Sequence, residues 1–99
     1  MIPITFQSKL WLWQAEKGAW HFITVPAEES DALRMFSPES KRGFGSVRVR
    51  AQIGDTVWKT SVFPSKERDG YILPVKKAVR TAEDLEVGST AAVKLEVEL

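Results

Sequence analysis

Apolar and polar residues alternate along several stretches of this 99-residue chain, with a period of two positions. That period is typical of half-buried β-strands, whose successive side chains point to opposite faces. It is clearest in residues 46–53, where apolar residues at odd-numbered positions alternate with serine, arginine and glutamine. The same pattern predicts six strands, at residues 4–13, 20–25, 46–53, 56–63, 71–74 and 90–99.

Two short segments, residues 27–36 and 75–85, show helical spacing instead. The first carries acidic residues in its opening turns and Arg34 late, the order that the helix dipole favours. In the second, apolar residues recur at the three- and four-residue intervals of one helix face. Between the central strands, Gly54 and Asp55 predict a two-residue hairpin turn of type II′.

Six strands that each have one apolar face need either two packed sheets or a closed barrel to avoid open edges. A chain of 99 residues and 11.2 kDa is expected to form a single domain, residues 1–99. At this length we favour the barrel. The predicted fold is mainly β, a small barrel of about six strands with two short helices.

One order of elements occurs twice along the chain: a strand, a proline, a helix, a Gly-Ser pair and a strand. The first copy uses Pro26 and residues 45–46, and the second uses Pro74 and residues 88–89. Two such units could close one pseudo-symmetric barrel with a helix at each end. The alternative is that prolines, glycines and short helices often connect strands in this order without any repeat, and the sequence leaves both interpretations open.

Composition excludes several kinds of site. The chain has no cysteine, so it has no disulfide, thiol nucleophile or thiolate metal site. Its one histidine cannot build a histidine-rich metal site, and we expect no metal and no cofactor. The first residues lack the basic and apolar regions of a secretory signal, and the longest apolar-rich stretch, residues 10–13, is too short to cross a bilayer. We therefore expect a cytoplasmic protein that makes no use of membranes.

Residues 72–80 (ILPVKKAVR), followed by residues 87–88 (VG) and a strand, resemble the core motif of the AbrB/MazE transcription-factor and antitoxin domains. Those domains dimerise through swapped hairpins to bind DNA. Ser89 departs from the motif, which usually has an acidic residue after the glycine.

A second resemblance covers nearly the whole chain and rests on four segments in order. They are residues 20–26 (WHFITVP), 43–49 (GFGSVRV), 62–64 (VFP) and 70–80 (GYILPVKKAVR). Together they look like the bacterial family called domain of unknown function 1905 (DUF1905). The resemblance implies a double-split β-barrel in which one chain supplies both halves. It implies no reaction, because the family has no established activity.

Candidate catalytic groups are sparse. His21 could act as a general base, but no neighbouring serine or aspartate completes a constellation, and an ordinary histidine is the simpler interpretation. Asp55 and Asp69 lie beside glycines, where aspartate is favoured in turns. The glycine loop at residues 43–45 lacks the length and the lysine of a phosphate loop. We therefore predict no catalytic residue.

The net charge of +1 hides an uneven distribution of charge. Residues 41–80 hold ten Lys and Arg against three acidic residues, whereas the segments on either side are net acidic. Arginine binds phosphate or carboxylate through two parallel hydrogen bonds, although a solvated charged surface is the simpler interpretation of such residues. The candidate ligand-binding residues are Arg48, Arg50, Trp58, Lys59, Tyr71, Lys76, Lys77 and Arg80.

Four tryptophans are many for a chain of this length. Trp11 and Trp13 share one strand face, which forms a ligand or partner surface if it is exposed and part of the core if a helix covers it. We expect core or half-buried positions for Trp20 and Trp58.

These features favour a non-catalytic small-barrel domain that binds an anionic small molecule or a protein partner through its basic residues. The alternative is a nucleic-acid-binding or antitoxin-like transcriptional regulator, by analogy to the AbrB/MazE motif, and an enzyme is the least favoured interpretation. A chain that holds both barrel halves is expected to be a monomer, whereas the DNA-binding relatives need dimers.

Overall fold

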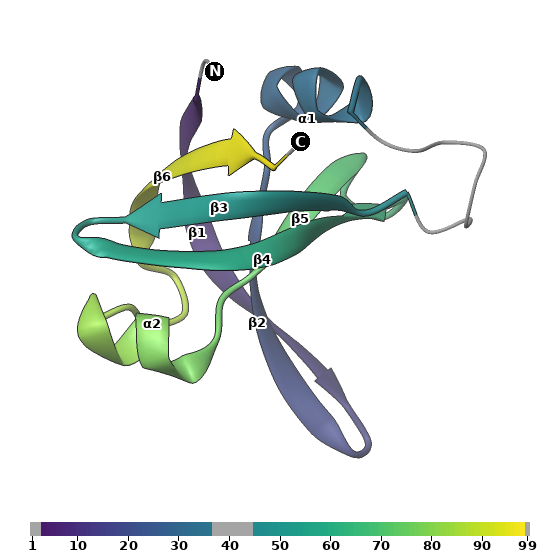
Figure 1. The fold of residues 1–99 in the computed structure, drawn as a ribbon. Coiled ribbons are helices and arrows are strands. Elements are labelled where there is room, and N and C mark those ends of the chain that lie inside the picture. The colour runs from purple at the N-terminus through teal and green to yellow at the C-terminus, as the bar shows by residue number, and fades with distance from the viewer. Residues whose placement is uncertain (1–2, 37–44, 99) are drawn as a thin grey trace.

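The computed structural model describes residues 3–36 and 45–98, whose arrangement is shown in Figure 1. In chain order its elements are β1 (Ile4–Ala15), β2 (Gly18–Thr24), α1 (Ala27–Arg34), β3 (Val47–Ile53), β4 (Thr56–Ser65), β5 (Gly70–Pro74), α2 (Lys77–Ala82) and β6 (Thr90–Val97). The strands form one closed barrel in the order β1-β2-β5-β4-β3-β6, and each neighbouring pair is antiparallel. The predicted fold class, a mainly β barrel of six strands with two short helices, is confirmed.

Two long strands each change partner midway, which allows the sheet to close on itself. β1 pairs with β6 through residues 4–9 and with β2 through residues 10–15. β4 pairs with β3 through residues 56–62 and with β5 through residues 63–65. These two split strands give the arrangement that the family resemblance implies.

Alternation along the strands fills the barrel interior. In β3 every second side chain is buried, and the side chains between them face outward. The same holds for β6, and the burial of these apolar side chains is the main force that holds the barrel together. The core residues are Leu10, Ile23, Val25, Leu33, Val47, Val49, Ala51, Ile53, Trp58, Val62, Tyr71, Leu73, Val75, Val79, Ala91, Val93, Leu95 and Val97.

The local predictions hold for the turn and only in part for the helices. Gly54 has a φ of 59° and Asp55 does not share this left-handed backbone, as a type II′ turn requires. α1 ends at Arg34 rather than at residue 36, and α2 covers Lys77–Ala82 rather than residues 75–85. The prediction for α2 was too long because Val75 continues the sheet: its N–H donates to the carbonyl oxygen of His21, at 2.9 Å.

The two halves of the chain are related by a pseudo-two-fold axis, so the predicted repeat is present in the barrel. The order of strands around the barrel is unchanged when β1 is exchanged with β4, β2 with β5 and β3 with β6. The bond from the Val25 N–H to Tyr71 and the bond from the Val75 N–H to His21 match under a shift of 50 positions. Figure 1 shows the corresponding helices, α1 and α2, at opposite ends of the barrel.

The shift of 50 positions corrects the alignment that the prolines indicated. It matches Val25 with Val75, because each is buried and each donates its N–H to the strand of the other half. Pro26 therefore corresponds to Lys76, and these two residues cap the two helices with nearly the same extended backbone. Pro74 lies two positions earlier, inside β5, so the predicted match between Pro26 and Pro74 was wrong.

The β1–β2 hairpin is longer than its counterpart and projects beyond the barrel, as Figure 1 shows. β2 pairs with β5 only through residues 22–24, whereas it pairs with β1 as far as the turn at Ala15 and Gly18. The outer part of this hairpin is thus a two-stranded ribbon beside the end of the barrel that carries α2.

Candidate functional site

A cavity of about 280 Å³ lies where the projecting hairpin meets β4 and α2. We call it the basic pocket. It is lined by Ala19, Trp20, His21, Trp58, Lys59, Thr60, Pro74, Val75, Lys76 and Arg80. Three of the side chains are cationic, and no carboxylate lines the cavity among the residues that the structure describes.

A short chain of hydrogen bonds fixes the wall of the basic pocket. The carbonyl oxygen of His21 accepts a bond from the N–H of Val75 at 2.9 Å. The carbonyl oxygen of Val75 in turn accepts a bond from Nη1 of Arg80 at 2.7 Å. Arg80 is half-buried, and this bond uses one of its five donors, so the guanidinium keeps donors for a ligand.

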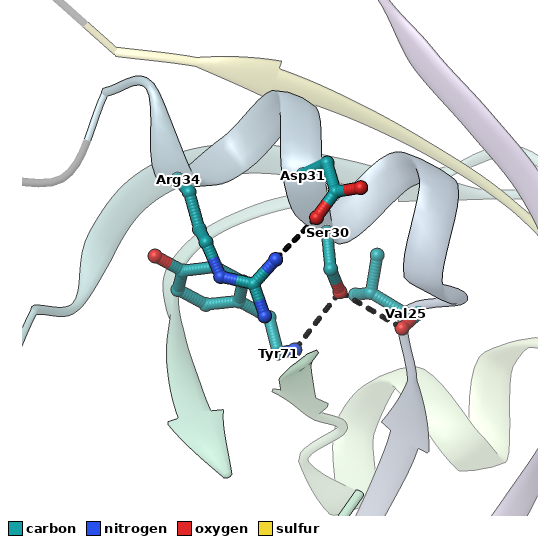
Figure 2. Close-up of polar contacts among 5 residues, drawn as sticks. All are labelled: Val25, Ser30, Asp31, Arg34 and Tyr71. Carbon is teal, nitrogen blue, oxygen red and sulfur yellow. Dashed lines mark hydrogen bonds and ion pairs between the residues drawn. The ribbon is translucent and has the colours of Figure 1, made fainter. Parts of the chain in front are cut away.

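The opposite end of the barrel has the same scaffold with different side chains. The N–H of Val25 donates to Tyr71 at 2.9 Å, and the hydroxyl of Ser30 donates to the carbonyl oxygen of Val25 at 3.0 Å. Ser30 thus stands where Arg80 stands in the other half, and Tyr71 corresponds to His21. Figure 2 shows Ser30 between Val25 and the backbone nitrogen of Tyr71.

This difference buries Tyr71 and leaves its counterpart His21 half-buried, although a cavity of about 300 Å³ is also lined by Tyr71 and Gly70 at the other end. Tyr71 is 3% exposed, and Ser30 is completely buried because its hydroxyl also accepts the Tyr71 N–H at 2.9 Å. His21 is half-buried, and the long side chain of Arg80 lies beside it rather than a serine sealed in the core. At the basic pocket the two halves of the pseudo-symmetric barrel therefore differ in chemistry, with His21 and Arg80 in place of Tyr71 and Ser30.

The cations of the pocket come from two elements. α2 and the residue before it contribute Arg80 and Lys76, and β4 contributes Lys59, whose Nζ lies 3.6 Å from a carboxylate oxygen of Glu98. The pKa of His21 is lowered, first by its burial and second by the positive charge of Arg80. The imidazole is therefore neutral near pH 7, when it can both donate and accept a hydrogen bond.

The structure brings together four of the eight predicted site residues, namely Trp58, Lys59, Lys76 and Arg80. Lys77 lies on the same helix but is exposed and does not line the pocket. Tyr71 lies at the opposite end of the barrel, against Ser30.

The other two predicted residues, Arg48 and Arg50, lie on the outer face of β3 and are paired with an acid of β6 and one that follows it. Arg48 lies 3.9 Å from Glu98, and Arg50 lies 3.8 Å from Glu96, its direct neighbour across the two strands. Exposed pairs of this kind contribute little to stability, but they reduce the positive charge available to a ligand on that face.

A comparison with known protein families agrees with this architecture. The model of the domain of unknown function DUF1905 matches residues 6–95. The chain belongs to this family. The resemblance stated from the sequence motifs is thus confirmed, whereas the resemblance to AbrB/MazE domains stays a prediction. A search of the curated proteins gave no match.

A second surface feature of this DUF1905 chain is a groove of about 350 Å³ on the outer face of the hairpin. We call it the aromatic groove, and it is lined by Trp11, Trp13, Trp20, Phe22, Ser65, Glu67 and Ile72. Trp13 is 45% exposed and Trp20 is 49% exposed. About half of Trp20 is therefore exposed, at the limit of the core or half-buried position expected for it, because β2 runs past the end of β5. Trp58 is buried, as expected.

His21 is the pocket residue whose position the sequence did not predict, since a lone histidine is most simply an ordinary surface or core residue. The signal was the repeat. Once Val25 is matched with Val75 instead of proline with proline, His21 falls opposite Tyr71, and Ser30 falls opposite Arg80. A change from a sealed serine to an arginine beside a histidine would have indicated where to search.

Two further findings concern the described part of the DUF1905 chain. Within residues 3–36 and 45–98, no group of three or more His, Asp or Glu side chains could hold a metal ion. Neither of the two helices in those segments has the length and apolar character that a membrane crossing requires. Asp55 and Asp69 lie in turns, and Asp69 has a φ of 53° there. Residues 43–44 of the predicted glycine loop lie outside the described segments.

Proposed function

We propose that this DUF1905 domain binds a small anion in the basic pocket and that it acts as a binding module rather than as an enzyme. The observation that carries the proposal is the convergence of Lys59, Lys76 and Arg80 on one cavity without an opposing carboxylate among the described lining residues. Arg80 is held by Val75, so part of the cost of ordering its side chain is already met before a ligand arrives. Neutral His21 adds a hydrogen-bonding group to the same wall.

The remaining expectations from the sequence become proposals with the same support. A monomer is supported by the closure of the barrel within one chain, and the cytoplasm stays the proposed location. A binding role is supported over catalysis because the pocket joins cations to a single imidazole, with no serine or carboxylate among the described lining residues to complete a catalytic set. The DNA-binding alternative gains nothing from Arg48 and Arg50, since Glu98 and Glu96 face them.

Titration with inorganic phosphate at low ionic strength, followed by NMR of backbone and His21 signals, tests the proposal. We expect shifts at residues of the basic pocket, weakened about tenfold in Arg80→Gln and about threefold in Lys76→Gln. Lys77→Gln is the matched control: it removes the same charge from the same helix outside the pocket and should leave the affinity unchanged. If Lys76→Gln and Lys77→Gln weaken phosphate binding equally, the affinity depends only on the net charge of the protein, and the proposal is overturned.

The same preparation separates the DNA-binding alternative. Binding of duplex DNA releases counterions, so its affinity falls steeply with added salt in proportion to the phosphates contacted. A shift of random duplex at about 50 mM salt that disappears near 200 mM would favour the regulator over the small-anion site. We expect no such shift.

A further inference from the structure

We infer that the ligand of the basic pocket is a phosphate monoester of a planar aromatic ring, whose ring lies on Trp20 in the aromatic groove. This inference rests on the proposed function and adds the chemical class of the ligand. Trp20 carries it, because this residue lines both the basic pocket and the aromatic groove. The two cavities therefore meet at this residue of β2, and a molecule that is anionic at one end and aromatic at the other can contact both of them there.

The groove presents aromatic rings that are already ordered by their neighbours. Trp13 and Trp20 pair across the hairpin with ring centroids 5.3 Å apart and planes tilted by 46°. Behind them, Trp11 and Phe22 pair with centroids 5.2 Å apart and a tilt of 37°. These are favourable aromatic arrangements that do not stack the rings face to face. Ring faces of the outer pair thus stay open toward solvent.

The inner pair is fixed and already in use. The indole N–H of Trp11 donates to the hydroxyl of Thr24 at 2.9 Å, and the guanidinium of Arg68 lies 3.7 Å from the Trp11 ring centroid. Trp11 therefore acts as a rigid base for the groove. The surface that a ligand ring can stack on is supplied by Trp13 and Trp20, whose exposed fractions are close to one half.

Charge decides which kind of aromatic ligand fits. Three cations lie at the basic-pocket end, whereas Glu67 is the one charged residue among the described residues that line the groove, and the nearby Arg68 is already engaged on the Trp11 ring. A nucleic-acid strand would carry further phosphates along the rings and toward that carboxylate, which repels them. A single terminal phosphate on a planar ring matches the distribution, with its charge beside Lys59, Lys76 and Arg80 and its uncharged ring on Trp20.

Phosphate is favoured over carboxylate as the anionic group. Three cations from two elements face the pocket, and an arginine fork accepts a phosphate through two parallel bonds. A doubly charged headgroup with three oxygens can meet Arg80 and a lysine at the same time. A single carboxylate leaves more of this positive charge uncompensated.

Calorimetric titration of the full chain with 1-naphthyl phosphate and with methyl phosphate tests the inference. The two probes share a headgroup and differ in the ring. We expect 1-naphthyl phosphate to bind about fivefold to tenfold more tightly, the lower part of the range that one stacked ring adds. In Trp20→Leu the ratio of the two affinities should fall to nearly one, because the larger loss falls on 1-naphthyl phosphate. Since Trp20 is an exposed side chain, its removal opens no core cavity, and an unchanged circular dichroism spectrum reports a folded chain.

Phe63→Leu is the matched control, because Phe63 is an exposed aromatic side chain that lines neither cavity. It should keep the full preference for the naphthyl ring. The inference is overturned if the wild-type chain binds the two probes equally, or if Trp20→Leu and Phe63→Leu reduce the preference alike. Failure of the proposed function looks different: neither probe binds, or Lys76→Gln and Lys77→Gln weaken both probes to the same extent.

Discussion

The hydroxyl oxygen of Ser30 accepts a hydrogen bond from the backbone N–H of Tyr71 at 2.9 Å, across 41 positions of the chain. The same hydroxyl donates to the carbonyl oxygen of Val25, so one buried side chain joins α1 to the ends of β2 and β5 (Figure 2). This contact ties α1 to the strands at the barrel end opposite the basic pocket. Its counterpart in the other half is the contact between Arg80 and Val75.

Ser30→Ala should lower the free energy of unfolding by about 1–3 kcal/mol, because it leaves the buried N–H of Tyr71 without its acceptor. Urea denaturation followed by circular dichroism measures the change. Thr81→Ala, which removes an exposed hydroxyl at the corresponding region of α2, is the control and should change stability by less than about 0.5 kcal/mol. Equal effects of the two substitutions would show that the Ser30 hydroxyl contributes nothing specific.

Gly70 is required by the same contact. A Cβ at this position would lie 2.5 Å from the Ser30 hydroxyl oxygen and 3.0 Å from its Cβ. Gly70→Ala should therefore destabilise the fold by about 1–3 kcal/mol through overpacking. The Gly70→Ala/Ser30→Gly double variant removes both clashing atoms, so its loss of stability should be smaller than the sum of the two single losses. Additive losses would contradict this explanation.

The alternation of apolar residues was sufficient to predict most of the strands, because each strand buries one face, and the chain length then favoured a barrel over two packed sheets. The end of β5 could not be predicted in the same way. Val75 fits a helical pattern, but its N–H donates to the carbonyl oxygen of His21 in another strand. A backbone hydrogen bond to a distant strand cannot be recognised from the residues that neighbour Val75 in the sequence. α2 consequently begins later than the pattern indicates.

The candidate site was predictable only where its residues come from one local segment. Lys76 and Arg80 lie on one short stretch of the chain. Lys59 joins them in the basic pocket because β4 runs beside that stretch. Arg50 had the same outward alternation as Lys59, and only the pairing of β3 with β6 shows that Glu96 lies opposite it. Sequence alternation shows which way a side chain faces but not which strand becomes its neighbour.

The lowered pKa of His21 predicts a dependence of stability on pH. The unfolded chain takes up a proton near the ordinary histidine pKa of 6.5, whereas the folded chain resists protonation because of burial and Arg80. Stability should therefore be full above about pH 6.5 and should decrease as the pH falls from there toward the lowered pKa of the folded chain. His21→Gln should remove this decrease. The groups that face His21 in the pocket are Arg80 and Lys76 near α2 and Lys59 on β4.

The pKa of His21 should also report whether phosphate is bound in the basic pocket. An anion beside the imidazole stabilises its protonated form, so saturating phosphate should raise the pKa of His21 in NMR titrations of the folded chain. In Arg80→Gln the unliganded pKa should rise as well, since the positive charge of Arg80 is one of the two causes that lower it. A His21 pKa that is identical with and without phosphate would argue against an anion in this pocket.

Glu98 limits the positive charge of the basic pocket, because one of its carboxylate oxygens lies 3.6 Å from Nζ of Lys59. Glu98→Gln should free Lys59 and tighten phosphate binding by about twofold to fivefold, the range expected for one largely exposed ion pair. Glu96→Gln is the matched control, since Glu96 pairs with Arg50, which does not line the pocket. Calorimetry at low ionic strength measures both affinities. If the two substitutions strengthen binding equally, the gain comes from net charge, and Lys59 has no particular role in holding the anion.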